Sequence, residues 1–224
     1  MNFGQLRITN LDEQLHTIVM QNWREDNARW NVAPRYISGQ GLRWDHERRY
    51  IFDAGNEFHK FEVLDVSHPT MGIERIAWDG TYYQAYPYPA VVRRNYLTDV
   101  DADGAFMIRN SEMRDINTTC DYVWVNYELK APYAGDVYVH GLWTNREPRD
   151  TYLMAYDADS GAYRASVLQK QGYYSYQFLM KDGTQPPSEG SFFQTENRYQ
   201  ALVYHRAAGD RAWQLVAYRS VMLR

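Results

Sequence analysis

The sequence predicts an all-β protein built from two tandem β-sandwich domains, residues 1–115 and 116–224, of which the second is immunoglobulin-like. Three observations predict this fold. Apolar and polar residues alternate along most of the chain, whereas helical periodicity is nearly absent. Tyrosine and tryptophan, which form strands well, number 20 and 7 against 8 phenylalanines. Turn signals in the second half recur roughly every 8–12 residues, as in a sandwich of short strands.

In the first half, strands are expected where alternation is bounded by turn residues, at 15–21, 57–64, 72–78, 82–86 and 105–109. Asp79-Gly80 lies between two of these segments and is a strong signal for a hairpin turn. Pro87 and Pro89 then end the pairing, because proline has no backbone N–H to donate.

A polar run at residues 110–119 interrupts this pattern, and we place the domain boundary within it, near residue 115. More regular strands are expected after it, at 121–129, 136–142, 151–156, 162–168, 172–180, 199–205 and 212–219. This spacing is typical of an immunoglobulin-like sandwich, although the Cys…Trp…Cys pattern of antibody domains is missing.

Composition excludes several other classes of protein. The chain of 224 residues is 45% hydrophobic, unlike a disordered segment, and its one cysteine excludes a disulfide scaffold. A net charge of −4 gives no broad attraction to nucleic acid or anionic membranes, and no apolar run approaches the roughly 20 residues that span a bilayer. The first residues do not form a signal peptide, so either the protein is cytoplasmic or an export signal lies upstream.

Sequence motifs give no support for an enzyme. The chain contains neither a G-x-S-x-G nucleophile elbow nor a G-x-G-x-x-G or phosphate-binding loop. The six histidines show no metal-ligand spacing such as H-x-x-x-H. Cys120 has no sequence cue that couples it to a base, so we expect a buried, inert thiol. We therefore expect no catalytic residues and no cofactor.

An acidic segment offers a weak alternative for a metal site. Asp99, Asp101 and Asp103, followed by Gly104, match the first half of a calcium-binding loop. Position 12 of that loop is Asn110 instead of a bidentate glutamate. The segment is therefore interpreted mainly as an acidic turn between strands.

Aromatic and basic residues gather near the start of the chain. Arginine, tryptophan and tyrosine dominate the energetically important positions of protein–protein interfaces. They also form structural stacks on protein surfaces, so both interpretations stay open. The candidate partner-binding residues are Trp23, Arg24, Trp30, Arg35, Tyr36, Arg43 and Trp44.

The second domain is similar to the early-set sandwich of glycogen-binding modules. Val137 to Thr144, Gly161 to Arg164 and Gly172 to Phe178 carry this resemblance. It implies an alternative function in which Trp143, Tyr173, Tyr174 and Tyr176 bind a glycan by ring stacking.

A second resemblance covers most of the chain. Five motif segments occur in order, at 21–28, 52–61, 99–108, 170–177 and 189–199, and include Gly55-Asn56-Glu57-Phe58. Together they resemble the C-terminal two domains of the type IX secretion system plug family of Bacteroidetes. A third interpretation is that these segments only form a scaffold, with Gly55 to Phe58 as a buried turn.

The plug-family resemblance implies a non-enzymatic periplasmic subunit that binds and occludes an outer-membrane translocon β-barrel. It also implies a signal peptide and an N-terminal domain outside these 224 residues. The expected partner is the barrel protein. Nucleic acid, a small-molecule ligand and a membrane-spanning segment are not expected.

Overall fold

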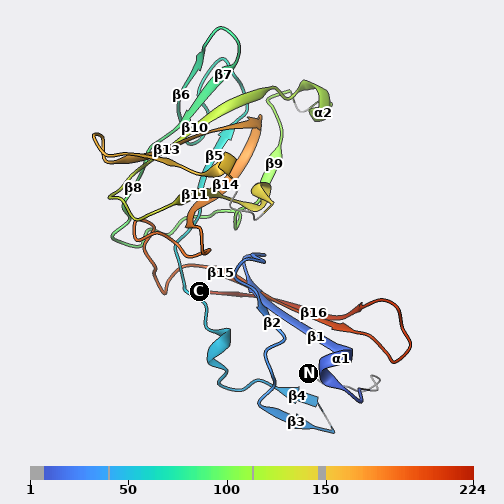
Figure 1. Cartoon of the computed structure of the whole chain (residues 1–224). Coiled ribbons are helices and arrows are strands. Elements are labelled where there is room, and N and C mark those ends of the chain that lie inside the picture. Colours follow the sequence, from blue (N-terminus) through green and yellow to red (C-terminus); the bar gives the residue numbers. More distant parts are fainter. Residues whose placement is uncertain (1–7, 40, 113, 146–149) are drawn as a thin grey trace. The chain divides into compact units, whose positions relative to one another are not determined.

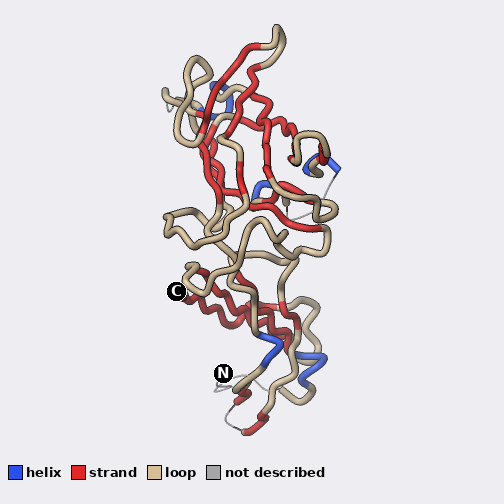
Figure 2. Tube along the Cα trace, turned by 90° about the vertical axis from the view of Figure 1, so that its left-hand side faces the viewer, coloured by secondary structure: helices blue, strands red, loops and turns tan. Residues whose placement is uncertain are grey.

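The computed structural model describes residues 8–39, 41–112, 114–145 and 150–224. It is an all-β protein, as the sequence predicts, with a few short helices before β1 and in the connections between strands (Figures 1 and 2). Two compact units are present. Unit 1 comprises the residues before Ala54 and after Thr195, and unit 2 comprises Ala54–Thr195.

Unit 1 contains a sheet with the strand order β16-β15-β1-β2 and a separate hairpin of β3 and β4. β1 pairs antiparallel with β15 along its whole length, from Leu15 opposite His205 to Gln21 opposite Tyr199. The elements are α1 (Leu11–Gln14), β1 (Leu15–Gln21), β2 (Arg29–Trp30), β3 (Tyr36–Ser38), β4 (Gly41–Arg43), the 3-10 helix η1 (Arg48–Tyr50), β15 (Asn197–His205) and β16 (Gln214–Leu223).

Unit 2 is a sandwich of two sheets. One sheet has the order β12-β13-β10-β7-β6, with β8 beside β10, and the other has the order β11-β14-β5, with β9 also beside β14. The strands are β5 (His59–Val63), β6 (Ile73–Trp78), β7 (Tyr83–Pro87), β8 (Ala90–Val91), β9 (Phe106–Ile108), β10 (Tyr122–Lys130), β11 (Val137–His140), β12 (Ala155–Asp157), β13 (Ala162–Lys170) and β14 (Gly172–Met180). The connections hold α2 (Ile116–Thr119), η2 (Leu142–Thr144) and η3 (Asp150–Tyr152).

The strand order of unit 2 explains its likeness to an immunoglobulin sandwich. In that fold, strands A, B, E and D form one sheet and C, F and G form the other. Strands β10 to β14 take the places of B to F in chain order. The position of strand G, beside β14, is filled by β5, which comes from much earlier in the chain.

The boundary predicted near residue 115 does not coincide with the division of the structure. β7 pairs with β10 and β5 pairs with β14, so strands from both sides of residue 115 share sheets. The polar segment around residue 115 contains the exposed helix α2 and connects strands within unit 2. Unit 2 is thus inserted into unit 1, and the two are nested instead of tandem.

The core of unit 2 lies between its two sheets and is rich in aromatic rings. Phe61 stacks on Tyr174 with ring centroids 5.4 Å apart, and Tyr127 meets Tyr176 edge to face at 5.1 Å. The buried hydroxyl of Tyr127 donates to Oε1 of Gln169 at 2.7 Å. Part of the tyrosine excess therefore lies in the core with its hydroxyl groups hydrogen-bonded, and not at contact surfaces.

Candidate protein-binding surface

The β3–β4 hairpin of unit 1 carries the most exposed part of the predicted partner-binding set. Tyr36 pairs with Arg43 across the hairpin, and the Arg35 backbone N–H donates to the Arg43 carbonyl at 2.9 Å. The Arg35 guanidinium lies 5.8 Å from the centre of the Tyr36 ring. The structure thus brings Arg35, Tyr36 and Arg43 together, as an arginine–tyrosine surface of the kind enriched in interfaces.

The hairpin also exposes apolar surface. Tyr36 is 52% exposed and its neighbour Ile37 is 65% exposed. On the strand beside Tyr36, Arg43 forms a surface ion pair with Asp45 at 2.5 Å. Exposed rings and aliphatic side chains flanked by charged groups suit a contact that must form and also dissociate.

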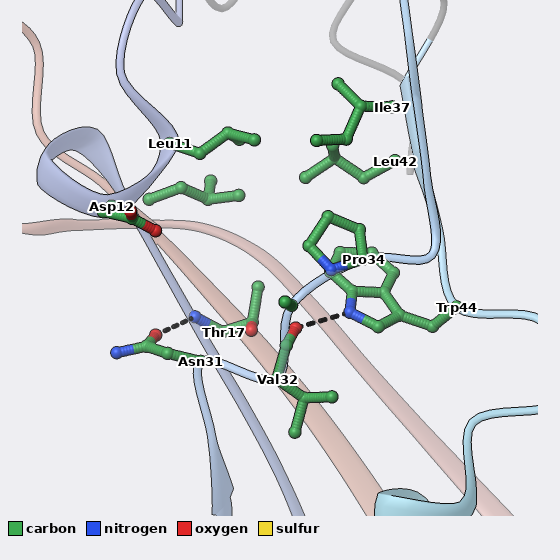
Figure 3. A pocket seen from close by; sticks show the side chains of 11 residues that line it. Leu11, Asp12, Thr17, Asn31, Val32, Pro34, Ile37, Leu42 and Trp44 are labelled. Atoms are coloured by element: carbon green, nitrogen blue, oxygen red, sulfur yellow. Dashed lines mark hydrogen bonds between the residues drawn. The ribbon is translucent and has the colours of Figure 1, made fainter.

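A cavity of about 360 Å³ adjoins this hairpin (Figure 3). Its walls are mainly apolar and come from α1, β1, the segment after β2 and the hairpin. Trp44 closes one side and is fixed by a hydrogen bond of 2.6 Å from its Nε1 to the Val32 carbonyl. Asn31 accepts from the Thr17 backbone N–H at 3.0 Å. The lining residues are Leu11, Asp12, Leu15, Thr17, Asn31, Val32, Ala33, Pro34, Ile37, Leu42 and Trp44.

Trp23 and Arg24, by contrast, have structural positions. Trp23 adopts a left-handed backbone conformation (φ 57°), and its backbone N–H donates to Oε1 of Gln200. Its ring stacks on Tyr218 with the ring centroids 5.9 Å apart. Arg24 is buried and forms an ion pair with Asp26. Trp30, on β2, is exposed. Of the predicted set, Trp23 and Arg24 therefore contribute little to an accessible surface.

The motif around Asn22 shapes the turn after β1. Asn22 also has a positive φ of 52°, which asparagine tolerates better than most residues. Its side chain donates to Oδ1 of Asn197 at 2.9 Å and accepts from the Arg198 backbone N–H at 2.8 Å. The first and last motif segments of the sequence thus meet here, and they hold β1 and β15 together.

In unit 2, the motif segment 52–61 contacts Glu189, which begins the last motif segment and is 1% exposed. Its carboxylate forms an ion pair with Arg93, lies 3.2 Å from Nε2 of His59 and accepts from the Phe178 backbone N–H at 3.1 Å. Asn56 donates to the Glu189 carbonyl at 2.9 Å. Burial alone would raise the pKa of Glu189, but His59 and Arg93 outweigh it and lower the pKa to about 2.

The acidic segment Asp99 to Asp103, which precedes β9, contacts residues of the same region. Asp101 accepts hydrogen bonds from the backbone N–H groups of Phe58 and Asp103, while Lys60 donates to Asp99 at 2.6 Å. Burial raises the pKa of Asp101 to about 6, despite the opposing effect of these N–H donors. The carboxylates of Asp99 and Asp101 are therefore engaged by the chain's own donors, and the described residues contain no group of three or more His, Cys, Asp or Glu side chains that could hold a metal ion.

The residues of the glycan alternative do not form an open platform. Tyr174 and Tyr176 are 3% and 4% exposed and face the core. Trp143 is partly buried and meets Tyr174 edge to face at 5.7 Å. Tyr173 lies on the opposite face of β14 and is half-buried. The structure brings three of these rings together, but as part of the core packing.

Cys120 is buried, as expected, and burial raises the pKa of its thiol. No helix among the described residues is both long and apolar enough to cross a membrane.

Sequence reasoning missed Ile37 and the cavity. A strand of three residues is too short for alternation to mark its exposed face, and the cavity joins segments that are separated in sequence.

Comparison with known proteins gives a likeness to a solved structure. No protein-family model matches the chain, and no curated protein matches it. The chain is similar to a solved structure, the crystal structure of a hypothetical protein from Parabacteroides merdae ATCC 43184 at 2.30 Å resolution. The two are 31% identical with a TM-score of 0.89, and the match covers 99% of this chain and 58% of that one. The chain thus spans a little over half the length of the Parabacteroides protein.

Proposed function

We propose that this chain is a non-enzymatic periplasmic plug subunit that binds and occludes the outer-membrane translocon barrel of type IX secretion. Two findings support the proposal. The five motif segments resemble that family in their order, and the similar solved structure comes from a Bacteroidetes species. Occlusion requires only that a folded body fit against an opening, so no bond is made or broken.

The observation that carries the proposal is the exposed hairpin surface, defined here as Arg35, Tyr36, Ile37 and Arg43. Aromatic and arginine side chains supply most of the binding energy in protein–protein interfaces, mainly from positions that become desolvated. Tyr36 and Arg43 lie on one face of the hairpin and Ile37 lies on the other, beside the cavity. Tyr36 and Ile37 provide apolar contacts, while Arg35 and Arg43 provide charged groups next to Tyr36. These charged groups are expected to speed association and to make it sensitive to salt.

Cross-linking in cells followed by purification tests this proposal. The full-length gene product that carries this chain, with any export signal that it encodes, is tagged and expressed in a Bacteroidetes host with type IX secretion, and is expected to recover the translocon barrel. Replacing Tyr36 and Ile37 together by alanine should lower that recovery by about tenfold or more, the effect of losing roughly 1.4 kcal/mol or more of binding energy.

A matched control is available in unit 2. Tyr88 is 62% exposed, and Tyr88→Ala should leave recovery of the barrel unchanged. Circular dichroism of each variant checks that the fold is retained. Wild-type protein that recovers no barrel, or that is found only in the cytosol, would refute the plug function. Equal recovery by the wild type and the hairpin double variant would exclude the hairpin as the binding surface.

A further inference from the structure

Strand β16 is an edge strand with unusual exposure. It pairs with β15 on one side, from Gln214 opposite His205 to Leu223 opposite Asn197, and no described strand pairs with its other side. All ten of its residues are exposed. Its outer edge therefore presents backbone donors and acceptors that can accept another strand.

Both faces of this strand are apolar. A bulge interrupts the pairing between Ala217 and Leu215, and from Ala217 onward the side chains alternate regularly. Val221 and Leu223 lie on one face, and Tyr218 and Met222 lie on the other. These four side chains are each between 40% and 56% exposed.

The strand also lacks the usual protection of a free edge. Natural edge strands are often blunted by proline, by lysine or by inward-pointing charges. β16 contains no proline or lysine, and its sole charged residue is Arg219. Such a strand, apolar on both faces, has the composition of an interior strand.

The regular stretch from Ala217 to Leu223 is complementary to itself. In an antiparallel pair centred on Ser220, Tyr218 lies opposite Met222 of a second copy, and Ala217 lies opposite Leu223. Arg219 then lies opposite Val221 and avoids the second copy's Arg219. A pair centred on Arg219 would oppose two like charges, and one centred on Tyr218 would run into the bulge.

We propose that β16 is a homodimerisation edge, at which two copies of this chain pair antiparallel about Ser220 and join their unit 1 sheets. The Tyr218–Met222 pairs would place sulfur against an aromatic ring on one face. Stable interfaces bury about 800 Å² on each partner, which is more than one strand edge provides. The dimer is therefore expected to dissociate in the micromolar range. This inference does not depend on the plug function.

Analytical ultracentrifugation of the full chain tests the association. The wild type should shift from 26.5 kDa toward twice that mass as its concentration rises to about 200 μM. Ile51→Lys, at an even more exposed apolar position of unit 1 that lies outside β16, should leave this shift unchanged. A wild-type protein that stays monomeric at the highest concentration would overturn the proposal.

Two substitutions at one exposed position test the register. Val221→Lys would place a lysine opposite Arg219 and should weaken the dimer at least tenfold. Val221→Glu would place a carboxylate there and should strengthen the dimer several-fold at low salt, since opposite charges across a strand pair attract. Equal weakening by both variants would indicate unspecific apolar association and would overturn the pairing.

Disulfide trapping gives a second, independent readout. In a Cys120→Ala background, Ser220→Cys should form a cross-linked dimer under mild oxidation, because the two positions face each other. Tyr218→Cys and Arg219→Cys should not, because in this register their counterparts lie beyond the reach of about 7 Å between Cα atoms. Efficient cross-linking at 218 or 219 instead of 220 would refute the proposed register.

Discussion

Replacing Glu189 by glutamine removes one buried negative charge and leaves Arg93 and His59 without their counter-charge. The fall of the Glu189 pKa from 4.5 to about 2 corresponds, at about 1.4 kcal/mol per pH unit, to about 3 kcal/mol of stability at neutral pH. Breaking a buried ion pair typically costs about 3–5 kcal/mol. We therefore expect Glu189→Gln to lower the free energy of unfolding by about 3 kcal/mol at pH 7.

The pH dependence of this loss provides the sharper test. Folding lowers the pKa of Glu189, so its ionised form stabilises the folded protein above pH 4.5, and the contribution disappears as the pH falls from 4.5 toward 2. Urea denaturation should show a difference between wild type and variant that is constant from pH 7 to pH 5 and shrinks below pH 4.5.

Glu128 offers a matched control, because its carboxylate lies 3.6 Å from Arg164 in a more exposed ion pair. Glu128→Gln should cost at most about 1 kcal/mol, as is usual for surface pairs. A Glu189→Gln variant within 1 kcal/mol of wild type at pH 7, or a difference that does not shrink in acid, would refute the electrostatic reasoning.

Three further predictions concern unit 2. Folding raises the pKa of Asp101 to about 6, so the stabilisation from its protonated form is present below pH 3.8 and lost as the pH rises through 6. Wild type should therefore lose stability relative to Asp101→Asn between pH 4 and pH 7 in urea denaturation, and a constant difference would contradict this. Gly72→Ala should lower the free energy of unfolding by about 2 kcal/mol or more, since φ is +72° and a Cβ would lie 2.6 Å from a backbone oxygen. Gly80→Ala, with open space around it, should lower it by about 1 kcal/mol in the same assay. Tyr127→Phe should lower stability by about 1–3 kcal/mol in thermal denaturation, because Gln169 loses its buried donor, and an unchanged melting temperature would argue against this hydrogen bond.

Local alternation predicted the strands well where it was long and regular. The segment 172–180 forms β14 with the same bounds, because its apolar residues at every second position face the core. The pairing of β5 with β14 and of β7 with β10 depends on partners far away in sequence, so the local pattern placed the boundary at 115 incorrectly. Strands β2 and β8, with two residues each, are too short to show alternation.

The candidate sites were predictable only in part. Residue type identified Arg35, Tyr36 and Arg43, which lie together on one hairpin. It could not show that the left-handed turn after β1 packs Trp23 on Tyr218. Glu189 lies in a proline-rich loop, and its buried ion pair with Arg93 leaves no mark on the surrounding sequence.

The insertion of unit 2 within unit 1 has a consequence for biosynthesis. Leu15 pairs with His205, so β1 leaves the ribosome long before its main partner is made. Unit 2 is complete once Thr195 has emerged and can fold while the chain is still growing. The sheet of unit 1 must wait for β15, so a chain that stopped shortly after Thr195 would keep unit 2 but would leave β1 without the strand it pairs with.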